Sequence, residues 1–317
     1  MAERQRVLVV GFGSIGRRHL ANVQARGLEV AVLRRPGSEG DAAGFEVVTS
    51  YADAERWGPT AVIVATPTSL HADAARWALE HGLHVLVEKP LTADPVDARE
   101  LEELAERAGT CAAVAYNLRF HPALEAVAAA IANGRIGRLL TVSAEVGRYL
   151  PDWHPGEDYS TGYAARADLG GGALLTLSHE LDYVCWIAGE PVWSDGARFA
   201  VSELELDVDD LAFVCCRHRS GAVSLVRMDY LDRSFNRRSR WIGETATIET
   251  SWGGPVQLLA GDATETLWDD PTSELADTYV ATLDDFLAAA ASGRPPRTSF
   301  AEARRLVEVC AGAELRA

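Results

Sequence analysis

A short apolar run that leads directly into a glycine-rich turn places the strongest constraint on the fold of this chain. Residues 7–10 (Val-Leu-Val-Val) precede Gly11-Phe12-Gly13-Ser14-Ile15-Gly16, and a helical stretch follows to about residue 27. In a strand–turn–helix unit the first glycine permits the tight turn, the second lets backbone N–H groups reach a phosphate, and the third allows the helix to pack closely on the strand. The spacing predicts a dinucleotide-binding turn, with a glycine-rich connection that binds nothing as the alternative.

Strand-like and helix-like segments continue to alternate through the first 120 residues. The pattern predicts strands at 30–33, 61–65, 85–87 and 111–115, and helices at 69–80 and 95–107. Such alternation is typical of βαβ units, whose strands form a doubly wound parallel sheet. We therefore expect a first domain of the α/β class that spans residues 1–120.

The pattern changes after about residue 120, and a length of 317 residues favours a second domain, 121–317. Residues 192–260 consist mostly of strand-like runs. The remaining predicted elements are a strand at 139–146 and helices at 121–132, 172–188, 274–291 and 300–313. We expect an α+β domain built on a large, mostly antiparallel sheet.

Composition argues against several classes of function. Lys and Arg number 30 against 46 Asp and Glu, and the net charge of -16 repels nucleic acid and anionic membranes. No apolar run approaches the ~18 residues that span a bilayer, and no signal-peptide pattern opens the chain. The 5 cysteines form no C-x-x-C motif, so they are expected to be reduced in a cytoplasmic protein. The basic cluster with interleaved aromatics at 233–241 is expected to form a solvated strand face or a subunit contact, with a nucleic-acid patch as the alternative.

The end of the second predicted strand indicates which nicotinamide cofactor the turn would bind. An NAD site places an acidic residue about 20 residues after the glycine turn, where it accepts a hydrogen bond from the ribose 2′-hydroxyl. This chain has Arg34 and Arg35 there. Guanidinium groups suit a 2′-phosphate, so NADP(H) is favoured and NAD(H) is the alternative. The alternative interpretation is that both arginines are solvated surface residues that bind no ligand.

Lys89 is the one lysine among 30 basic residues, and it follows the predicted strand 85–87 directly. Open α/β sheets bind ligands at the carboxyl ends of their strands. Pro90 disfavours helical geometry at Lys89 and holds the segment extended. Arg does not lose its proton at accessible pH, whereas Lys can be tuned toward neutrality by its surroundings. Lys89 is therefore a candidate acid/base residue, with a generic surface lysine as the alternative.

Several further motifs occur in a characteristic order. They are Gly11-x-Gly13-x-x-Gly16-Arg17-Arg18-His19, Ala65-Thr66-Pro67, Glu88-Lys89-Pro90, Asn117-x-Arg119-Phe120-x-Pro122, and Gly170-Gly171-Gly172 with His179 after six further residues. In these motifs the chain resembles the Gfo/Idh/MocA oxidoreductases, which include glucose–fructose oxidoreductase and inositol dehydrogenase, over essentially its whole length. The resemblance implies an N-terminal Rossmann domain, a C-terminal domain with an open sheet, a nicotinamide cofactor and reversible oxidation of a sugar, cyclitol or similar polyol.

The resemblance also implies site residues. Those expected to bind the cofactor are Gly11, Phe12, Gly13, Ser14, Ile15, Gly16, Arg34, Arg35, Thr66, Pro67, His71, Glu88, Lys89 and Asn117. In relatives, the Lys of Glu-Lys-Pro and a His on the helix after the glycine run are the usual acid/base pair, and they correspond to Lys89 and His179.

One position departs from the family pattern. Many relatives carry Asp three residues before the His, where this chain has Thr176, and Thr cannot act as a carboxylate base. Asp182 lies one helical turn after His179 and is a candidate to orient its imidazole, with a purely structural role as the alternative. No third residue has convincing spacing for a metal site with these two, so no metal is expected.

The segment 149–163 is expected to choose the substrate. It holds four aromatic side chains and a histidine, and long loops with large aromatics are often binding loops. Aromatic faces would cover the C–H face of a sugar; the alternative is that they fill the core. Arg166 would meet an anionic group or form an exposed ion pair. The expected substrate-binding residues are Lys89, Arg119, Trp153, Tyr159, Tyr163, Arg166, Thr176 and His179.

These observations predict a cytoplasmic oxidoreductase that transfers a hydride between NAD(P) and a secondary alcohol or ketone of a sugar, sugar nucleotide or cyclitol. Two alternatives stay open: a redox-neutral epimerase or lyase that retains its cofactor, and a non-catalytic regulator of the same fold. By resemblance, a homo-oligomer (dimer or tetramer) that associates through the C-terminal sheet is expected, with no nucleic-acid or membrane partner.

Overall fold

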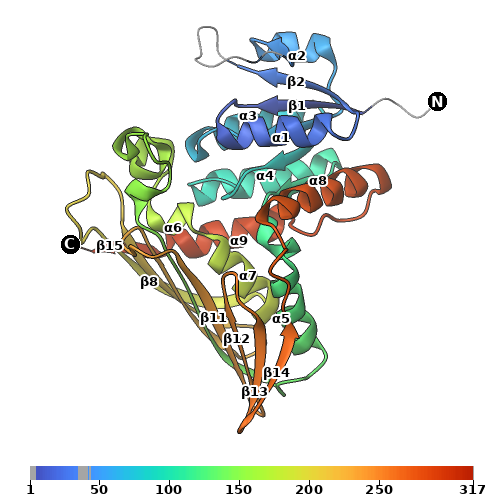
Figure 1. The fold of residues 1–317 in the computed structure, drawn as a ribbon. Helices are drawn as coiled ribbons and strands as arrows, with labels where there is room; N and C mark the ends of the chain where they lie inside the picture. The colour runs from blue at the N-terminus through green and yellow to red at the C-terminus, as the bar shows by residue number, and fades with distance from the viewer. Residues whose placement is uncertain (1–4, 35–41, 43, 317) are drawn as a thin grey trace. The chain divides into compact units, whose positions relative to one another are not determined.

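The protein is described from a computed structural model that covers residues 5–34, 42 and 44–316 (Figure 1). It divides into two compact units. The first comprises Met1–Ala115 and Tyr279–Val307, and the second comprises Tyr116–Thr278 and Glu308–Ala317. The predicted division at 120 places residues 279–307 in the second domain, whereas the structure packs them on the first unit.

A parallel sheet forms the centre of the first unit, as the alternating pattern predicts. Its strand order is β3-β2-β1-β4-β5-β6. The strands are β1 (Arg6–Val10), β2 (Glu29–Leu33), β3 (Glu46–Val48), β4 (Ala61–Val64), β5 (His84–Val87) and β6 (Ala112–Val114). The helices that follow strands are α1 (Ser14–Gln24), α2 (Tyr51–Trp57), α3 (His71–Glu80) and α4 (Pro95–Ala108). Since β1 pairs with both β2 and β4, the strand order reverses beside β1, and ligands bind at such a point in open α/β sheets.

The C-terminal helices complete the core of the first unit. Leu283 and Phe286 of α8 (Leu275–Ser292) are buried in one cluster with Val9 and Ile63 of the sheet. Each fully buried side chain of this kind contributes about 1.5–3 kcal/mol relative to exposure. An amphipathic pattern shows that a helix has a buried face without showing which sheet that face covers, so the sequence alone did not place this segment.

The second unit is built on a mostly antiparallel sheet of order β14-β13-β12-β11-β7-β10-β9-β8-β15 (Figure 1). Its strands are β7 (Leu139–Gly147), β8 (Pro191–Phe199), β9 (Leu211–His218), β10 (Val223–Asp229), β11 (Asn236–Gly243), β12 (Thr247–Ser251), β13 (Val256–Ala260), β14 (Ala263–Trp268) and β15 (Ala313–Arg316). The β7–β10 and β8–β15 pairs are parallel and the others antiparallel. The predicted fold class, a doubly wound parallel sheet followed by an α+β domain with a mostly antiparallel sheet, is confirmed.

Helices pack against this sheet. They are α5 (Pro122–Ala132), α6 (Ala173–Thr176) and α7 (His179–Ala188), while α9 (Phe300–Ala311) leads into β15. The single helix predicted over 172–188 is instead two, because Leu177 adopts φ -102° and ψ 22° and Ser178 adopts φ -65° and ψ -2°. The interruption makes His179 the first residue of α7.

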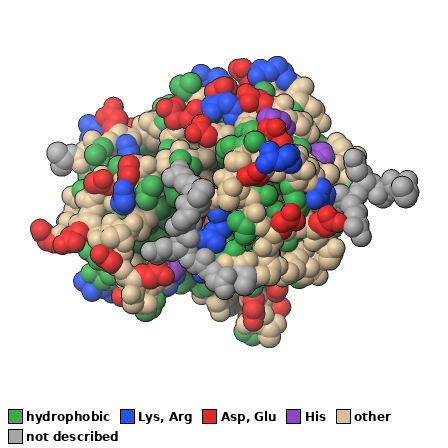
Figure 2. Space-filling model, turned by 90° about the horizontal axis from the view of Figure 1, so that it is seen from above, with side chains coloured by type: hydrophobic (Ala, Val, Ile, Leu, Met, Phe, Trp, Pro, Cys, Tyr) green, Lys and Arg blue, Asp and Glu red, His purple; other side chains and the backbone are tan. Residues whose placement is uncertain are grey.

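The surface carries both acidic and basic side chains, as the share of charged residues in the sequence predicts. Acidic and basic side chains are intermixed on the face in Figure 2, without one large basic patch. Within the ranges that the structure describes, no helix has the length and apolar character that crossing a membrane requires.

Candidate functional site

The glycine turn has the geometry that its spacing predicts. Gly11 adopts φ +108°, which favours glycine, and a Cβ there would lie 2.5 Å from the carbonyl oxygen of Ala65. A Cβ on Gly16 would overlap the carbonyl oxygen of Gly11, whereas a Cβ on Gly13 would meet no described atom within 4 Å. Gly13 is also the N-cap of α1. The turn is therefore tight on its inner side and open where the first-turn N–H groups of α1 face outward, as a phosphate requires.

A cavity of about 480 Å³ opens beside this turn. Its lining comes from the carboxyl ends of four strands and from α3: Val10, Gly11, Phe12, Leu33, Arg34, Thr49, Ser50, Tyr51, Thr66, Leu70, Asp73 and Ala74. Of the residues expected to bind the cofactor, the cavity thus brings together Gly11, Phe12, Arg34 and Thr66. Its volume lies in the range of small-molecule and cofactor sites.

Two guanidinium groups flank the ring of Phe12 at the mouth of the turn. The Arg34 guanidinium lies 4.5 Å from the ring centroid and that of Arg17 lies 4.9 Å from it. Arg17 Nε also donates to the carbonyl oxygen of Phe12 at 3.3 Å. Cation–π contacts hold both cations beside the cavity. Arg35, the second arginine that the sequence predicts here, lies outside the described residues.

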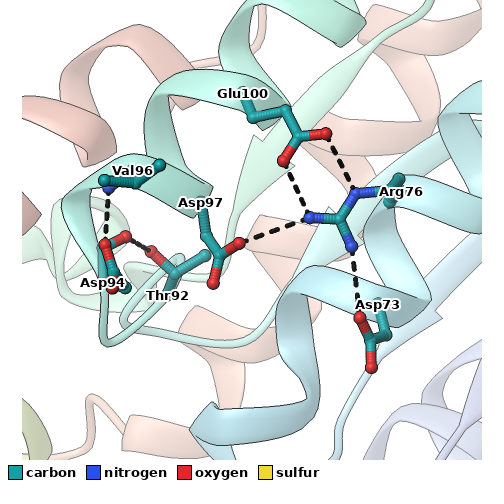
Figure 3. Close-up of polar contacts among 7 residues, drawn as sticks. All are labelled: Asp73, Arg76, Thr92, Asp94, Val96, Asp97 and Glu100. Carbon is teal, nitrogen blue, oxygen red and sulfur yellow. Dashed lines mark hydrogen bonds and ion pairs between the residues drawn. The ribbon is translucent and has the colours of Figure 1, made fainter.

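The one acidic residue among the cavity's described lining residues is itself ion-paired. Asp73 accepts a hydrogen bond from Arg76 at 3.1 Å, and Arg76 also binds Asp97 at 3.3 Å and Glu100 at 2.9 Å on α4 (Figure 3). The hydrogen bond that Arg76 donates to Glu100 raises the pKa of Arg76. Figure 3 also shows the start of α4, where Asp94 accepts from the Val96 amide. The Asp73 charge is therefore partly compensated.

Lys89 lies half-buried in the turn that follows β5, on the same sheet edge as the glycine turn. The preceding Glu88 is buried; one oxygen lies 2.7 Å from His19 Nε2, and the other accepts from the Lys89 amide at 3.3 Å. Burial opposes ionisation of Glu88, but the hydrogen bond and charge of His19, with the charge of Lys89, hold its pKa below the ordinary value. Glu88 thus anchors the Lys89 turn to α1.

The sequence predicts that His71 binds the cofactor. Its side chain is 1% exposed and contacts backbone atoms of the protein. Its Nδ1 lies 2.9 Å from the carbonyl oxygen of Pro90, and its Nε2 lies 2.9 Å from that of Thr66. Both ring nitrogens contact backbone carbonyls, so His71 links two turns, and its expected cofactor contact stays a prediction. Pro67, which follows Thr66, caps the short helix before α3.

His179 begins α7 in the second unit. Its ring is half-buried and packs edge-to-face on Tyr116, with centroids 5.7 Å apart and an interplanar angle of 81°. The Tyr116 hydroxyl lies 3.3 Å from Ser178 Oγ. Burial raises the pKa of Tyr116 well above its ordinary value, and the charge of Asp182 adds to this effect. The His179 ring is thus held against a neutral phenol.

Arg119 and Asp182 form a buried ion pair. Arg119 Nε lies 3.1 and 3.0 Å from the two carboxylate oxygens, and a second guanidinium nitrogen lies 2.7 Å from Oδ1. Two guanidinium nitrogens of Arg119 thus serve a structural pair, and its expected contact with substrate stays a prediction. The same contacts favour the structural alternative for Asp182. The described residues contain no group of three or more His, Cys, Asp or Glu suited to a metal ion.

Two other predicted residues also serve the second unit internally. Asn117 is buried, and its Nδ2 donates to Thr278 Oγ1 at 2.5 Å, while its expected contact with the cofactor stays a prediction. Thr176 is buried, and burial raises the pKa of Tyr230 well above its ordinary value, while Thr176 acts in the opposite direction. The position where relatives carry Asp thus lies beside a core phenol.

The aromatic loop folds onto its own unit. Trp153 packs edge-to-face on Tyr230 at 5.4 Å, and Tyr159 Oη accepts from the Glu205 amide at 3.2 Å. Both side chains are half-buried, so these contacts attach the loop to its unit without placing either ring in the core. Tyr163 is 40% exposed, so it remains a candidate for substrate contact. Arg166 binds Asp168 in an exposed ion pair, with nitrogen and oxygen 2.5 Å apart, which is the alternative to an anion contact.

Sequence reasoning missed part of the cavity. Thr49, Ser50 and Tyr51 line it because they follow β3, a short strand that pairs in parallel with β2. The run Glu46–Val48 is the sequence feature that could have predicted them, because the residues after each parallel strand lie at the same edge of the sheet. A strand of three residues carries too little periodicity to stand out.

Comparison with known proteins agrees with this geometry. Residues 5–116 match the model described as "Oxidoreductase family, NAD-binding Rossmann fold", and residues 124–249 match the GFO/IDH/MocA C-terminal domain. D-xylose 1-dehydrogenase (NADP(+)) 2 of Haloferax volcanii is 39% identical over 92 residues, which are 29% of this chain and 28% of that protein. For two of the curated relatives, this one among them, the chain spans well under half of the relative's length.

Two longer matches cover most of the chain. Levoglucosan dehydrogenase of Pseudarthrobacter phenanthrenivorans is 26% identical over 290 residues, 76% of this chain and 73% of that protein. A solved structure of a levoglucosan dehydrogenase with NADH has a TM-score of 0.83 and 20% identity, and covers 98% of this chain and 96% of its own. The two family models together match well over half of the chain, and the predicted resemblance is confirmed. The chain belongs to the Gfo/Idh/MocA family of NAD-binding oxidoreductases.

Proposed function

We propose that this protein is an NADP(H)-preferring oxidoreductase that transfers a hydride to or from a secondary alcohol or ketone carbon of a sugar, sugar nucleotide or cyclitol. The observation that carries the proposal is the position of Lys89. The one lysine of the chain lies at the carboxyl end of β5, on the sheet edge that also holds the glycine turn. The substrate class is supported by the relatives' names, which include xylose, levoglucosan and myo-inositol dehydrogenases.

The residues of the first unit fit a dinucleotide. The open space at Gly13 and the N-terminus of α1 would receive the pyrophosphate, and the cavity beside Phe12 would receive the adenosine half. When bound, the nicotinamide supplies the hydride acceptor or donor. The chain's own residues then have to hold the substrate oxygen and move its proton.

The preference for NADP(H) rests on charge. Arg34 lines the cavity beside Phe12, and Arg17 lies on the same ring. A 2′-phosphate carries negative charge that guanidinium groups bind in a charge-assisted manner. Asp73 is the one acidic residue among the described residues that line the cavity, and it forms an ion pair with Arg76.

Lys89 would donate a hydrogen bond to the substrate oxygen on which negative charge develops. Its position next to the buried Glu88 carboxylate fixes the backbone that carries it. His179 would exchange the proton of the substrate hydroxyl, because an imidazole titrates near neutral pH. These two roles come from the family resemblance, and the alternative is that the Lys89 amine is the proton carrier. Variants at each residue test the two roles separately.

We also propose that the protein is cytoplasmic and forms a homo-oligomer through the open sheet of the second unit. Its five cysteines are all free thiols, as a reducing compartment requires. Val223 and Leu225 of β10 and Phe213 of β9 lie along one face of the sheet, where Val223 is 42% and Leu225 50% exposed. Exposed apolar side chains of this kind mark association sites. Light scattering of wild type and Leu225→Glu tests the interface, since a monomeric wild type would exclude it.

Fluorescence titration with NADPH and NADH, followed by a screen of aldoses, cyclitols and nucleotide sugars for absorbance change at the reduced-nicotinamide band, tests the main proposal. Tighter binding of NADPH and hydride transfer with at least one polyol are expected. Equal or tighter binding of NADH would overturn the preference, and a cofactor that binds without transfer to any substrate class would overturn the activity.

A further inference from the structure

Both ring nitrogens of His71 face acceptors. Nδ1 lies 2.9 Å from the carbonyl oxygen of Pro90 and Nε2 lies 2.9 Å from the carbonyl oxygen of Thr66. The side chain is 1% exposed, so water does not compete for either contact. The imidazole therefore bridges the turn after β4 and the turn after β5.

A backbone carbonyl oxygen can only accept a hydrogen bond. A neutral imidazole has one N–H, so it could satisfy one of these carbonyls and would point a nitrogen lone pair at the other. An imidazolium donates from both nitrogens and satisfies both contacts. Two carbonyl oxygens within hydrogen-bond distance of the two ring nitrogens match the donor pattern of a doubly protonated ring.

The charges around His71 provide the balance that a buried cation requires. Glu88, in the turn after β5, is a buried carboxylate whose charge acts on His71, and it also faces His19 of α1 and the charge of Lys89. Asp73 on the same helix pairs with Arg76. The pKa of His71 lies below its ordinary value, because burial lowers it more than the two carbonyl bonds and the Glu88 charge raise it.

We propose that His71 is a positioning residue that, as an imidazolium, ties the Thr66 turn to the Lys89–Pro90 turn and so holds Lys89 in its working position. The inference rests on the proposed role of Lys89. Loss of the proton breaks one of the two bonds and frees one turn from the other. Turnover is then expected to fall as the pH rises through the pKa of His71, with little change in nucleotide affinity, because the ring itself faces backbone.

The protonation state can be measured directly, without substrate or cofactor. The chain has 8 histidines, so long-range ¹H–¹⁵N correlation of the histidine rings in the whole protein gives a tractable spectrum. His71→Asn, or His71→Gln should the first variant fold poorly, identifies the His71 signals by their loss. Both nitrogens are expected to be protonated in the acidic part of the folded range. A single neutral tautomer at every pH at which the protein is folded would overturn the inference.

Kinetics then test the consequence. The wild-type kcat is expected to decrease at high pH with the midpoint measured for His71, and His71→Asn is expected to have kcat lowered about 10-fold or more without that limb, while Kd for NADPH changes less than about 3-fold. His81→Asn is the control, because His81 lies at the exposed C-terminal end of the same helix. An unchanged kcat and pH profile in His71→Asn would contradict the positioning role.

The two proposals fail in different ways. If Lys89→Met retains full turnover, the proposed catalytic role of Lys89 is wrong, whatever the protonation state of His71. If Lys89→Met is inactive but the His71 ring stays neutral throughout, the catalytic assignment stands and the His71 inference is wrong.

Discussion

Arg119 and Asp182 bind each other with side chains that are 3% and 1% exposed, within the second unit. The pair fixes the first turn of α7, the helix that begins at His179, to the segment that precedes α5. Removing one member of a buried pair leaves an uncompensated charge, whereas replacing both by apolar residues is often neutral.

We therefore expect Arg119→Met to lower the free energy of unfolding by about 3–5 kcal/mol in urea denaturation. The double variant Arg119→Met/Asp182→Leu is expected to recover most of that loss. Arg166→Met is the matched control, because its pair with Asp168 is exposed and its removal should leave stability nearly unchanged. Equal effects at both arginines would contradict the assignment of Arg119 to a structural pair.

Arg34 provides the test of nucleotide preference. Because charge-assisted hydrogen bonds contribute about 1.5–3 kcal/mol, Arg34→Ala is expected to weaken NADPH binding about 10–100-fold and to leave NADH binding within a few fold. Isothermal titration with both nucleotides measures the ratio. Arg107→Ala, an exposed residue in the last turn of α4, serves as control. A parallel loss for both nucleotides would mean that Arg34 supports the turn and does not read the phosphate.

Gly11→Ala tests the glycine turn. The added Cβ would lie 2.5 Å from the Ala65 carbonyl oxygen in a residue with φ +108°, so the turn must deform. NADPH binding is expected to weaken at least about 10-fold. Gly27→Ala is the matched control, since Gly27 also has a positive φ (+68°) but open space around it. It should lower stability by about 1 kcal/mol with binding intact, and equal binding loss in both variants would contradict the account.

Glu88 predicts a pH dependence of stability. Its folded-state pKa lies below the ordinary value of 4.5, because the effects of His19 and Lys89 outweigh burial, so the ionised form stabilises the fold. That stabilisation is complete above about pH 4.5 and is lost as the pH falls through the lower folded value. Urea denaturation should show that wild type has a larger free energy of unfolding than Glu88→Gln, with a difference that is largest at neutral pH and decreases at acidic pH. A difference that increases at acidic pH would contradict the predicted direction.

Sequence patterns predicted those parts of the site that are formed by residues adjacent in the chain. The turn from Gly11 to Gly16 and the position of Lys89 depend on residues adjacent in the chain, and the structure places them at one sheet edge. Partners distant in sequence were beyond such reasoning. Arg119 pairs with Asp182, which is 63 positions away in the chain, and no local pattern predicts that an arginine will form a buried ion pair with such a distant residue.

The same limit applies to the elements. The interruption at Leu177–Ser178 follows from backbone torsions in a run of residues that all tolerate a helix, so sequence predicted one helix. The sequence does not distinguish a binding role from a core role for Trp153 and Tyr159, and their contacts with Tyr230 and Glu205 depend on residues distant in the chain.

The central claim is that an amine able to lose its proton acts at the carboxyl end of β5. Single-turnover hydride transfer should be compared in wild type, Lys89→Met and Lys89→Arg, with Kd for NADPH measured on the same samples. The account predicts a decrease of about 10²–10⁴-fold in Lys89→Met, a comparable loss in Lys89→Arg, and a Kd within about 3-fold of wild type. Hydride transfer at the wild-type rate in Lys89→Met would contradict it.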